Sequence, residues 1–293
     1  LIAWAGTSRR WSDQVHAPMM VVAVTTAVTL IGDVTLDRLI TQYPLQLASV
    51  LNQPQVGGRY YGFSNATFIM FTVSMLLIAA YGAERLNRAG ARRSAAVTVV
   101  LLGVFTVYLD GSAGFGADFG GPPAIIVGFA ALLVMVLRMP LTGPRILGVL
   151  GAAIIASFVF AWIDYQRPPD ERSHLGRFIQ TLLNGGGVEV ISRKLSAAFF
   201  GMPWAVIAIL LVVISVGVVV MWRLHSTGVL RGRFGRAFDG TILAAALRDL
   251  PVLRGSLLGV GAAVFVGPLI NDSSVVIPAM GLTIAAPLWV IAA

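Results

Sequence analysis

The chain has no cysteine and one lysine, and only 12% of its 293 residues are charged. Without cysteine it can form no disulfide, thiolate nucleophile or cysteine-ligated metal site. The three histidines, His16, His174 and His225, are scattered, so we expect no histidine-rich zinc site. A phosphate-binding glycine loop with its lysine and a G-x-S-x-G elbow are also missing. These absences exclude several common enzyme classes and leave open whether the chain is an enzyme.

Hydrophobic residues are abundant instead, at 57% of the chain, with a mean hydropathy of +0.84. Soluble domains have about 25% charged residues, and a membrane-spanning helix needs about 20 apolar residues. The sequence therefore predicts an all-α integral membrane protein of about eight transmembrane helices, forming one polytopic domain over residues 1–293. The apolar runs are 17–32, 65–83, 95–109, 122–137, 146–163, 204–222, 256–270 and 275–293. Because the chain begins at Leu1 with an apolar LIAWAG, we expect it to be a fragment of a longer protein.

Charge alternates between successive links. The N-terminal segment and the second, fourth and sixth links hold fourteen arginines and four acids, whereas the other links hold seven bases and nine acids. By the positive-inside rule the arginine-rich links are cytoplasmic, and both ends of the fragment lie inside. We therefore expect a multi-pass membrane protein with its arginine-rich links on the cytoplasmic side. Nucleic-acid binding is not supported, because membrane topology accounts for the basic charge.

The stretch from Tyr108 to Pro123, YLDGSAGFGADFGGPP, is the most unusual outer link. It places two carboxylates, Asp110 and Asp118, on a glycine-rich backbone between two apolar runs. Glycine lets the main chain approach a ligand or another helix closely, so the pattern predicts either a site or an ordinary solvated turn.

Two links contain amphipathic segments. In the outer segment 164–203, Ser173 can cap a helix whose apolar face ends at NGGG (184–187), and a second helix follows this hinge. The predicted apolar face is Leu175, Phe178, Ile179, Leu182 and Leu183. Such a helix-Gly-helix segment would lie in the outer interface as a lid or as a passive rim. The cytoplasmic segment 223–255 is a basic linker whose amphipathic part would rest on anionic lipid.

Outer bases next to apolar runs indicate an anionic ligand, because guanidinium groups bind phosphate in a bidentate manner. Tyrosine, asparagine and carboxylate side chains would suit a hydroxyl-rich group attached to that anion. The alternative is that Arg59 pairs with an acid only to hold the bundle together. The predicted substrate-binding residues are Arg59, Tyr60, Tyr61, Asn65, Asp118, Arg177, Arg193, Lys194 and Asn271.

Four outer acids are candidates for a catalytic role: Asp33, Asp110, Asp118 and Asp272. They could act as acid and base or relay protons, and an acid at membrane depth marks a functional site. Hard cations need several converging oxygens, and only carboxylates and loop carbonyls are on offer here, so we expect no metal site. The sequence indicates no particular cofactor.

The motifs RYYGFSN, GADFGG, SHLGRFIQTLLNGGG with RKLSAAF, and NDSSVVIPAMGL together resemble the membrane portion of multi-pass proteins of high-GC Gram-positive bacteria. The resemblance covers most of the chain, with one departure at Ser274, where glycine is expected. It implies that longer relatives carry an extracytoplasmic domain similar to alkaline phosphatases and sulfatases.

From these features we expect a membrane domain for cell-envelope biogenesis. It would bind an anionic, phosphate-bearing lipid or lipid-linked glycan at its outer face and present it to an extracytoplasmic domain or partner. One alternative is a proton-coupled transporter or flippase of such a lipid. Another is a glycosyltransferase that uses a polyprenyl-phosphate donor, with Asp33 or Asp110 as the base.

Overall fold

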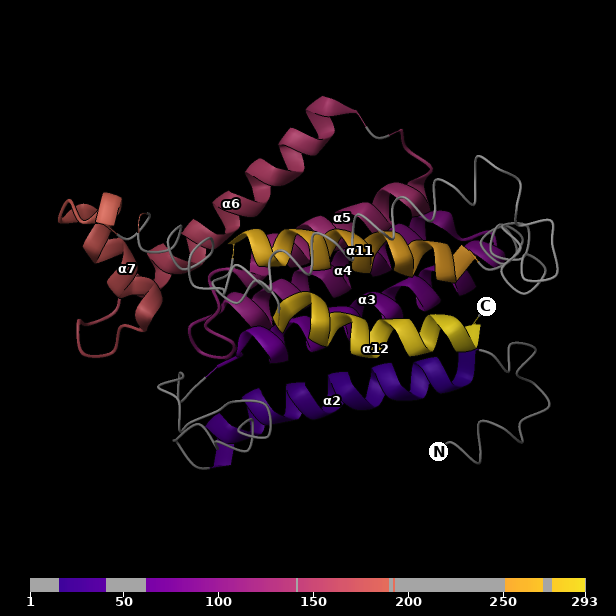
Figure 1. Cartoon of the computed structure of the whole chain (residues 1–293), viewed down its shortest axis with the longest axis horizontal. Coiled ribbons are helices and arrows are strands. Elements are labelled where there is room, and N and C mark those ends of the chain that lie inside the picture. Colours follow the sequence, from indigo (N-terminus) through magenta and orange to yellow (C-terminus); the bar gives the residue numbers. More distant parts are fainter. Residues whose placement is uncertain are drawn as a thin grey trace, which may run out of the picture.

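The computed structural model describes residues 16–40, 62–140, 142–189, 192, 251–270 and 276–292, and every structural statement below concerns these residues. The regular structure within them is helical, as Figure 1 shows. The helices are α2 (His16–Ile40), α3 (Asn65–Arg88), α4 (Arg92–Gly111), α5 (Gly121–Leu137), α6 (Gly143–Tyr165), α7 (His174–Leu183), α11 (Pro251–Ile270) and α12 (Val276–Ala292).

The predicted apolar runs lie within these helices wherever the structure describes them. Three helices extend five residues or more beyond their runs: α3 continues to Arg88, α11 begins at Pro251, and α2 continues through Asp33 and Asp37 to Ile40. The two acids are therefore part of a helix, where the sequence alone had placed them in a link. The predicted run at 204–222 and residues 223–250 of the basic linker lie outside the described residues.

Three of the described helices, α3, α4 and α6, are long and apolar enough to cross a membrane. Shorter apolar helices cover Met20–Thr35, Gly121–Leu137 and Leu258–Pro268. The described part of the chain thus has the helices of a multi-pass membrane protein.

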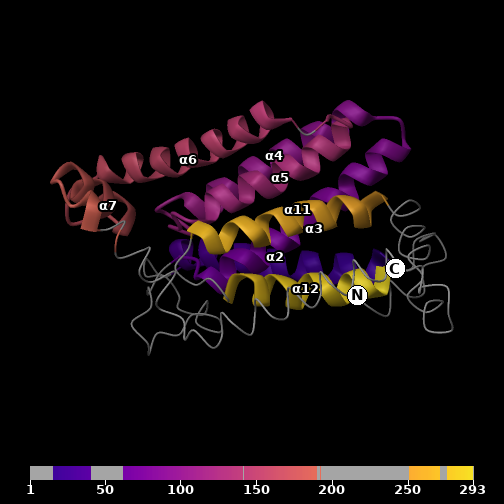
Figure 2. The same ribbon diagram turned by 45° about the horizontal axis from the view of Figure 1, so that its top comes forward.

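Helix α3 is the centre of the bundle. It packs against α2, α4, α5, α11 and α12, and Figures 1 and 2 show it surrounded by these neighbours. Phe68, Phe71, Leu76 and Leu77 of α3 are completely buried. By contrast, Leu147 and Ile155 of α6 are 70% and 64% exposed. An apolar helix that exposes large side chains fits contact with lipid.

Helices α5 and α11 cross closely through small residues. A Cβ atom on Gly128 would lie 2.9 Å from the Gly259 carbonyl oxygen, and one on Gly259 would lie 3.1 Å from the Gly128 carbonyl oxygen. Gly255, Gly259 and Ala263 follow one another at four-residue spacing along α11. Small residues at this spacing let membrane helices approach each other, so van der Waals packing holds this pair together.

The bundle has two distinct ends. We call the end with residues 112–120 and α7 the loop end; α3 and α5 begin there, and α4 and α6 finish there. We call the opposite end the arginine end, because Arg85, Arg88, Arg92, Arg138 and Arg145 lie where α3 and α5 finish and where α4 and α6 begin.

Candidate functional site

Residues 112–120 fold back over the last turn of α4. The Gly116 amide donates to the Leu109 carbonyl oxygen at 2.7 Å, and the Asp118 amide donates to the Asp110 carbonyl oxygen at 2.9 Å. These bonds satisfy carbonyl groups that a helix C-terminus leaves without partners. Ala117 has φ of 50° and its amide donates to the Ser112 carbonyl oxygen. The predicted glycine-rich link is therefore an ordered cap on α4.

The N-terminal side of α3 closes on this loop. The Phe63 amide donates to the Gly116 carbonyl oxygen at 2.8 Å. Gly62 has φ of 77°, and a Cβ atom there would clash with the same carbonyl oxygen. Ser64 then caps α3 by accepting a hydrogen bond from the Thr67 amide. The GFSN part of the RYYGFSN motif is thus what joins α3 to the glycine loop, and it places Asn65 at the loop end.

Asp110 and Asp118 converge at the start of α5. Their side chains are 0% and 1% exposed. If Gly121 carried a Cβ atom, the Oδ2 atoms of Asp110 and Asp118 would both lie within 2.8 Å of it. The two carboxylate oxygens are therefore no farther from each other than twice 2.8 Å. Asp118 Oδ1 also accepts a hydrogen bond from the Gly120 amide at 3.1 Å. The N-terminal end of the α5 dipole favours negative charge at this place.

This burial bears on the predicted roles of the two acids. In the arrangement described, a substrate could reach neither carboxylate unless the surrounding segments moved. The geometry therefore favours a positioning role for Asp118, whose hydrogen bond from the Gly120 amide fixes the end of the glycine loop at the start of α5.

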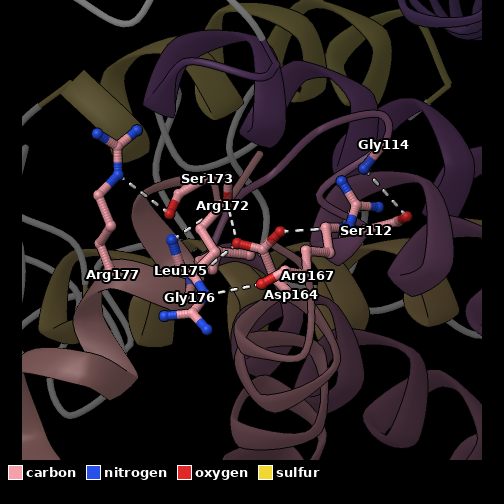
Figure 3. A network of polar contacts seen from close by, with 9 residues as sticks. All are labelled: Ser112, Gly114, Asp164, Arg167, Arg172, Ser173, Leu175, Gly176 and Arg177. Atoms are coloured by element: carbon pink, nitrogen blue, oxygen red, sulfur yellow. Dashed lines mark hydrogen bonds and ion pairs between the residues drawn. The ribbon is translucent and has the colours of Figure 1, made fainter. Parts of the chain in front are cut away.

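A third buried acid, Asp164, joins α6 to α7 (Figure 3). Its Oδ2 atom accepts hydrogen bonds from the Ser173 hydroxyl at 2.6 Å and from the Gly176 amide at 2.8 Å. The Ser173 hydroxyl oxygen in turn accepts from the Leu175 amide at 3.2 Å. The predicted cap on this helix is confirmed, but it is shared: a serine of the same segment and an acid of the preceding helix together satisfy the first amides of α7.

Helix α7 keeps the predicted apolar face with one exception. Leu175 and Ile179 are buried, and Phe178 and Leu182 pack partly buried beside them. Leu183 is 61% exposed, because eight positions after Leu175 the helix has turned by about 80°, which places this side chain at the edge of the apolar stripe. The predicted glycine stop is confirmed: Gly185 has φ of 85°, and the Gly186 amide donates to the Thr181 carbonyl oxygen.

We call the unit formed by α6 and α7 the arm. Three arginines lie on it. Arg167 forms an ion pair with Asp164 at 3.6 Å. Arg172 lies 4.3 Å from the centre of the Tyr165 ring and donates to the Arg167 carbonyl oxygen. Arg177 is exposed and donates from Nε to the Ser173 carbonyl oxygen at 3.4 Å (Figure 3). Arg167 and Arg172 are partly buried, whereas Arg177 is exposed. Arg177 is therefore the most accessible of these three arginines.

Aromatic rings connect the glycine loop to the arm. The ring of Phe119, in the loop, lies 5.7 Å from that of Phe158 on α6 and 5.0 Å from that of Phe178 on α7. These are the separations of favourable aromatic pairs. Two segments that are distant in sequence, the glycine loop and the arm, are therefore neighbours in space.

The predicted site residues are only partly brought together. Asn65, Asp110, Asp118 and Arg177 lie at the loop end, and Asp33 lies in α2 near the same end and is half-buried. Seven further predicted residues lie outside the described residues: Arg59, Tyr60, Tyr61, Arg193, Lys194, Asn271 and Asp272. Among the residues that were searched, no group of three or more His, Cys, Asp or Glu side chains could hold a metal ion.

Sequence reasoning missed the role of Asp164, which the charge pattern places only among the acids of the less basic links. A usable signal was present: an acid at the end of an apolar run, followed nine residues later by a serine at a helix start.

Comparison of the chain with protein-family models, with curated proteins and with solved structures found no match.

Proposed function

We propose that this chain is a membrane domain for cell-envelope biogenesis that binds a phosphate-bearing lipid or lipid-linked glycan at its loop end. In this proposal eight helices cross a bacterial cytoplasmic membrane, the loop end is extracytoplasmic, and the bound lipid is presented to an extracytoplasmic domain or partner.

One observation carries the proposal: Phe119 packs the glycine loop against the arm that bears Arg177. An exposed guanidinium on a helix that packs against an ordered glycine-rich loop suits a phosphate group, because arginine forms strong bidentate hydrogen bonds with phosphate oxygens. The hydrogen bond from the Gly120 amide to the buried Asp118 carboxylate supports this arrangement by fixing the end of the loop.

The arm also favours a lipid-linked ligand over a soluble one. Near the loop end of α6, Trp162 and Ile163 are 51% and 57% exposed. A lipid chain could lie along this apolar surface while its phosphate reaches Arg177. Tryptophan at such a position is typical of the membrane interface, where the polar part of a lipid is found.

Proton-coupled transport has less support from the described residues. It needs polar groups along a path through the bundle, yet the buried hydroxyls of Thr72, Thr106 and Ser157 donate to carbonyl oxygens of their own helices, four residues earlier. A glycosyltransferase with Asp110 as its base would need that carboxylate to become accessible.

The test measures binding of three probes to the purified chain in nanodiscs: undecaprenyl-phosphate glucose, undecaprenyl phosphate and undecaprenol. We expect the two phosphate-bearing lipids to bind and the alcohol to bind weakly. Arg177→Ala should weaken binding of both phosphate-bearing lipids about tenfold, the effect of losing one charge-assisted hydrogen bond. Arg177→Lys should weaken it less.

Arg145→Ala is the matched control, because it removes an arginine from the arginine end and should leave binding unchanged. Helical content and thermal unfolding of each variant show whether the fold is intact. If binding is unaltered in Arg177→Ala, Arg59→Ala and Arg193→Ala alike, the proposal is overturned.

A further inference from the structure

A cavity of about 1050 Å³ lies at the arginine end, on the opposite side of the bundle from the candidate site. Residues from the last turns of α3 and α5, the first turn of α4 and the beginning of α11 line it. Small-molecule sites usually measure about 300–1,000 Å³, so this cavity has room for a polar headgroup and the first part of its apolar tails.

The floor of the cavity is apolar. Ala83 and Leu132 are buried there, and Gly255 brings α11 so close that a Cβ atom on it would lie 2.9 Å from Leu132 Cδ1. Leu258, 48% exposed, forms part of the wall. Small residues therefore let the helices approach each other at the floor of the cavity, and leucines give the cavity an apolar surface.

The rim of the cavity is basic. Arg88, Arg92 and Arg138 come from three different helix ends. Among the described lining residues the one acid is Glu84, which forms an ion pair with Arg88 at 2.8 Å, so Glu84 and the three arginines together carry a net charge of +2. Arg92 donates from Nε to the Val136 carbonyl oxygen at 3.1 Å, which holds its guanidinium group over the cavity between α4 and α5.

We propose that this cavity is a binding site for an anionic phospholipid. The phosphate would lie on the rim formed by Arg92 and Arg138, and the glycerol and upper acyl chains would lie on the floor by Leu132 and Leu258. An apolar floor below a cationic rim complements an amphiphile with a negative head, and basic pockets between membrane helices on the cytoplasmic side bind anionic headgroups. These arginines would then do more than orient the chain in the membrane.

The site is independent of the proposed function, since it uses other residues at the other end of the bundle. Its occupant is best tested by native mass spectrometry of the whole chain with phosphatidylglycerol, phosphatidylcholine, glycerol 3-phosphate or inorganic phosphate. We expect phosphatidylglycerol to be retained in preference to phosphatidylcholine, and the two soluble phosphates not to be retained.

The decisive variants are matched in charge. Arg92→Ala with Arg138→Ala should weaken phosphatidylglycerol binding about tenfold or more. Arg93→Ala with Arg145→Ala removes the same charge from residues of the same end that do not line the cavity, and it should leave binding nearly unchanged. Leu258→Trp narrows the cavity from an exposed position and should also weaken binding, with no change of charge.

Three results would overturn the proposal. Equal losses in the two double variants would mean that the lipid responds only to surface charge. Equal retention of phosphatidylglycerol and phosphatidylcholine would mean that the rim does not select an anion. Retention of inorganic phosphate that is lost in Arg92→Ala with Arg138→Ala would assign the cavity to a soluble anion instead of a lipid.

Discussion

Asp164 and Ser173 are joined by a hydrogen bond of 2.6 Å, although they belong to different helices. The same carboxylate oxygen accepts from the Gly176 amide, so the last acid of α6 completes the cap of α7. Helix α7 has only ten residues, and isolated helices of that length are marginal in water. Its position over the glycine loop therefore depends on this one carboxylate together with its apolar face.

Replacing Asp164 should weaken the attachment of α7 to α6, and the size of the effect should depend on how many hydrogen bonds the new side chain keeps. Asp164→Ala removes both acceptor bonds and the ion pair with Arg167, and hydrogen bonds to a charged group contribute about 1.5–3 kcal/mol each. Asp164→Asn keeps one carbonyl oxygen and should have a smaller effect. Hydrogen exchange of the α7 amides is the measurement, and exchange should be faster in Asp164→Ala than in Asp164→Asn.

Glu171→Gln is the control for this series, because Glu171 is an exposed acid of the same segment. It should leave exchange in α7 unchanged. If Asp164→Ala does the same, the cap does not hold α7 in place.

Gly121 and Gly143 allow a second matched comparison, because each begins a helix and is followed by proline. A Cβ atom on Gly121 would clash with the carboxylates of Asp110 and Asp118, whereas one on Gly143 would meet no atom within 4 Å. We expect Gly121→Ala to lower the free energy of unfolding by about 1–3 kcal/mol, the usual cost of overpacking, and Gly143→Ala to leave it nearly unchanged. Equilibrium unfolding in mixed detergent micelles measures both, and equal stabilities would show that the two acids do not crowd Gly121.

The helices were predictable because an apolar run in lipid must satisfy its own backbone hydrogen bonds. The ends of the helices were harder to predict, because the length of an apolar run reflects the thickness of the hydrocarbon layer and not the length of the helix. Helix α3 continues past Ala83 to Arg88, with Arg85 and Arg88 in its last turn, where the helix dipole favours basic residues. The same reasoning applies to α2, which carries Asp33 and Asp37 beyond its apolar run.

The candidate site was predictable only in outline. The glycine pattern indicated that residues 108–123 were unusual, but the convergence of Asp110 and Asp118 depends on a backward fold through the positive φ of Ala117, which no residue preference specifies. Phe119 and Phe178 are in contact although they are 59 positions apart in the sequence. The periodicity of apolar residues within one segment carries no information about a contact between two segments.

That aromatic contact should be measurable as a coupling energy. In a double-mutant cycle, Phe119→Leu and Phe178→Leu should show an interaction of about 0.5–1.5 kcal/mol, the usual range for aromatic pairs. Phe105 on α4 is 41% exposed and offers a control partner, so Phe119→Leu and Phe105→Leu should be additive. Additivity in both cycles would mean that the loop and the arm are held together by other contacts.

The orientation of the whole bundle can be tested because the chain has no cysteine of its own. Thr181 lies on α7, and Ala89 directly follows Arg88, the last residue of α3. Both residues are exposed, and they lie at opposite ends of the bundle. In intact cells a membrane-impermeant thiol reagent should label Thr181→Cys and spare Ala89→Cys, and both should react once the membrane is permeabilised. The reverse pattern would place the loop end in the cytoplasm. The glycine loop and Arg177 would then face away from any extracytoplasmic partner, and the basic cavity would face the outer leaflet, so this experiment decides the sidedness of both proposals at once.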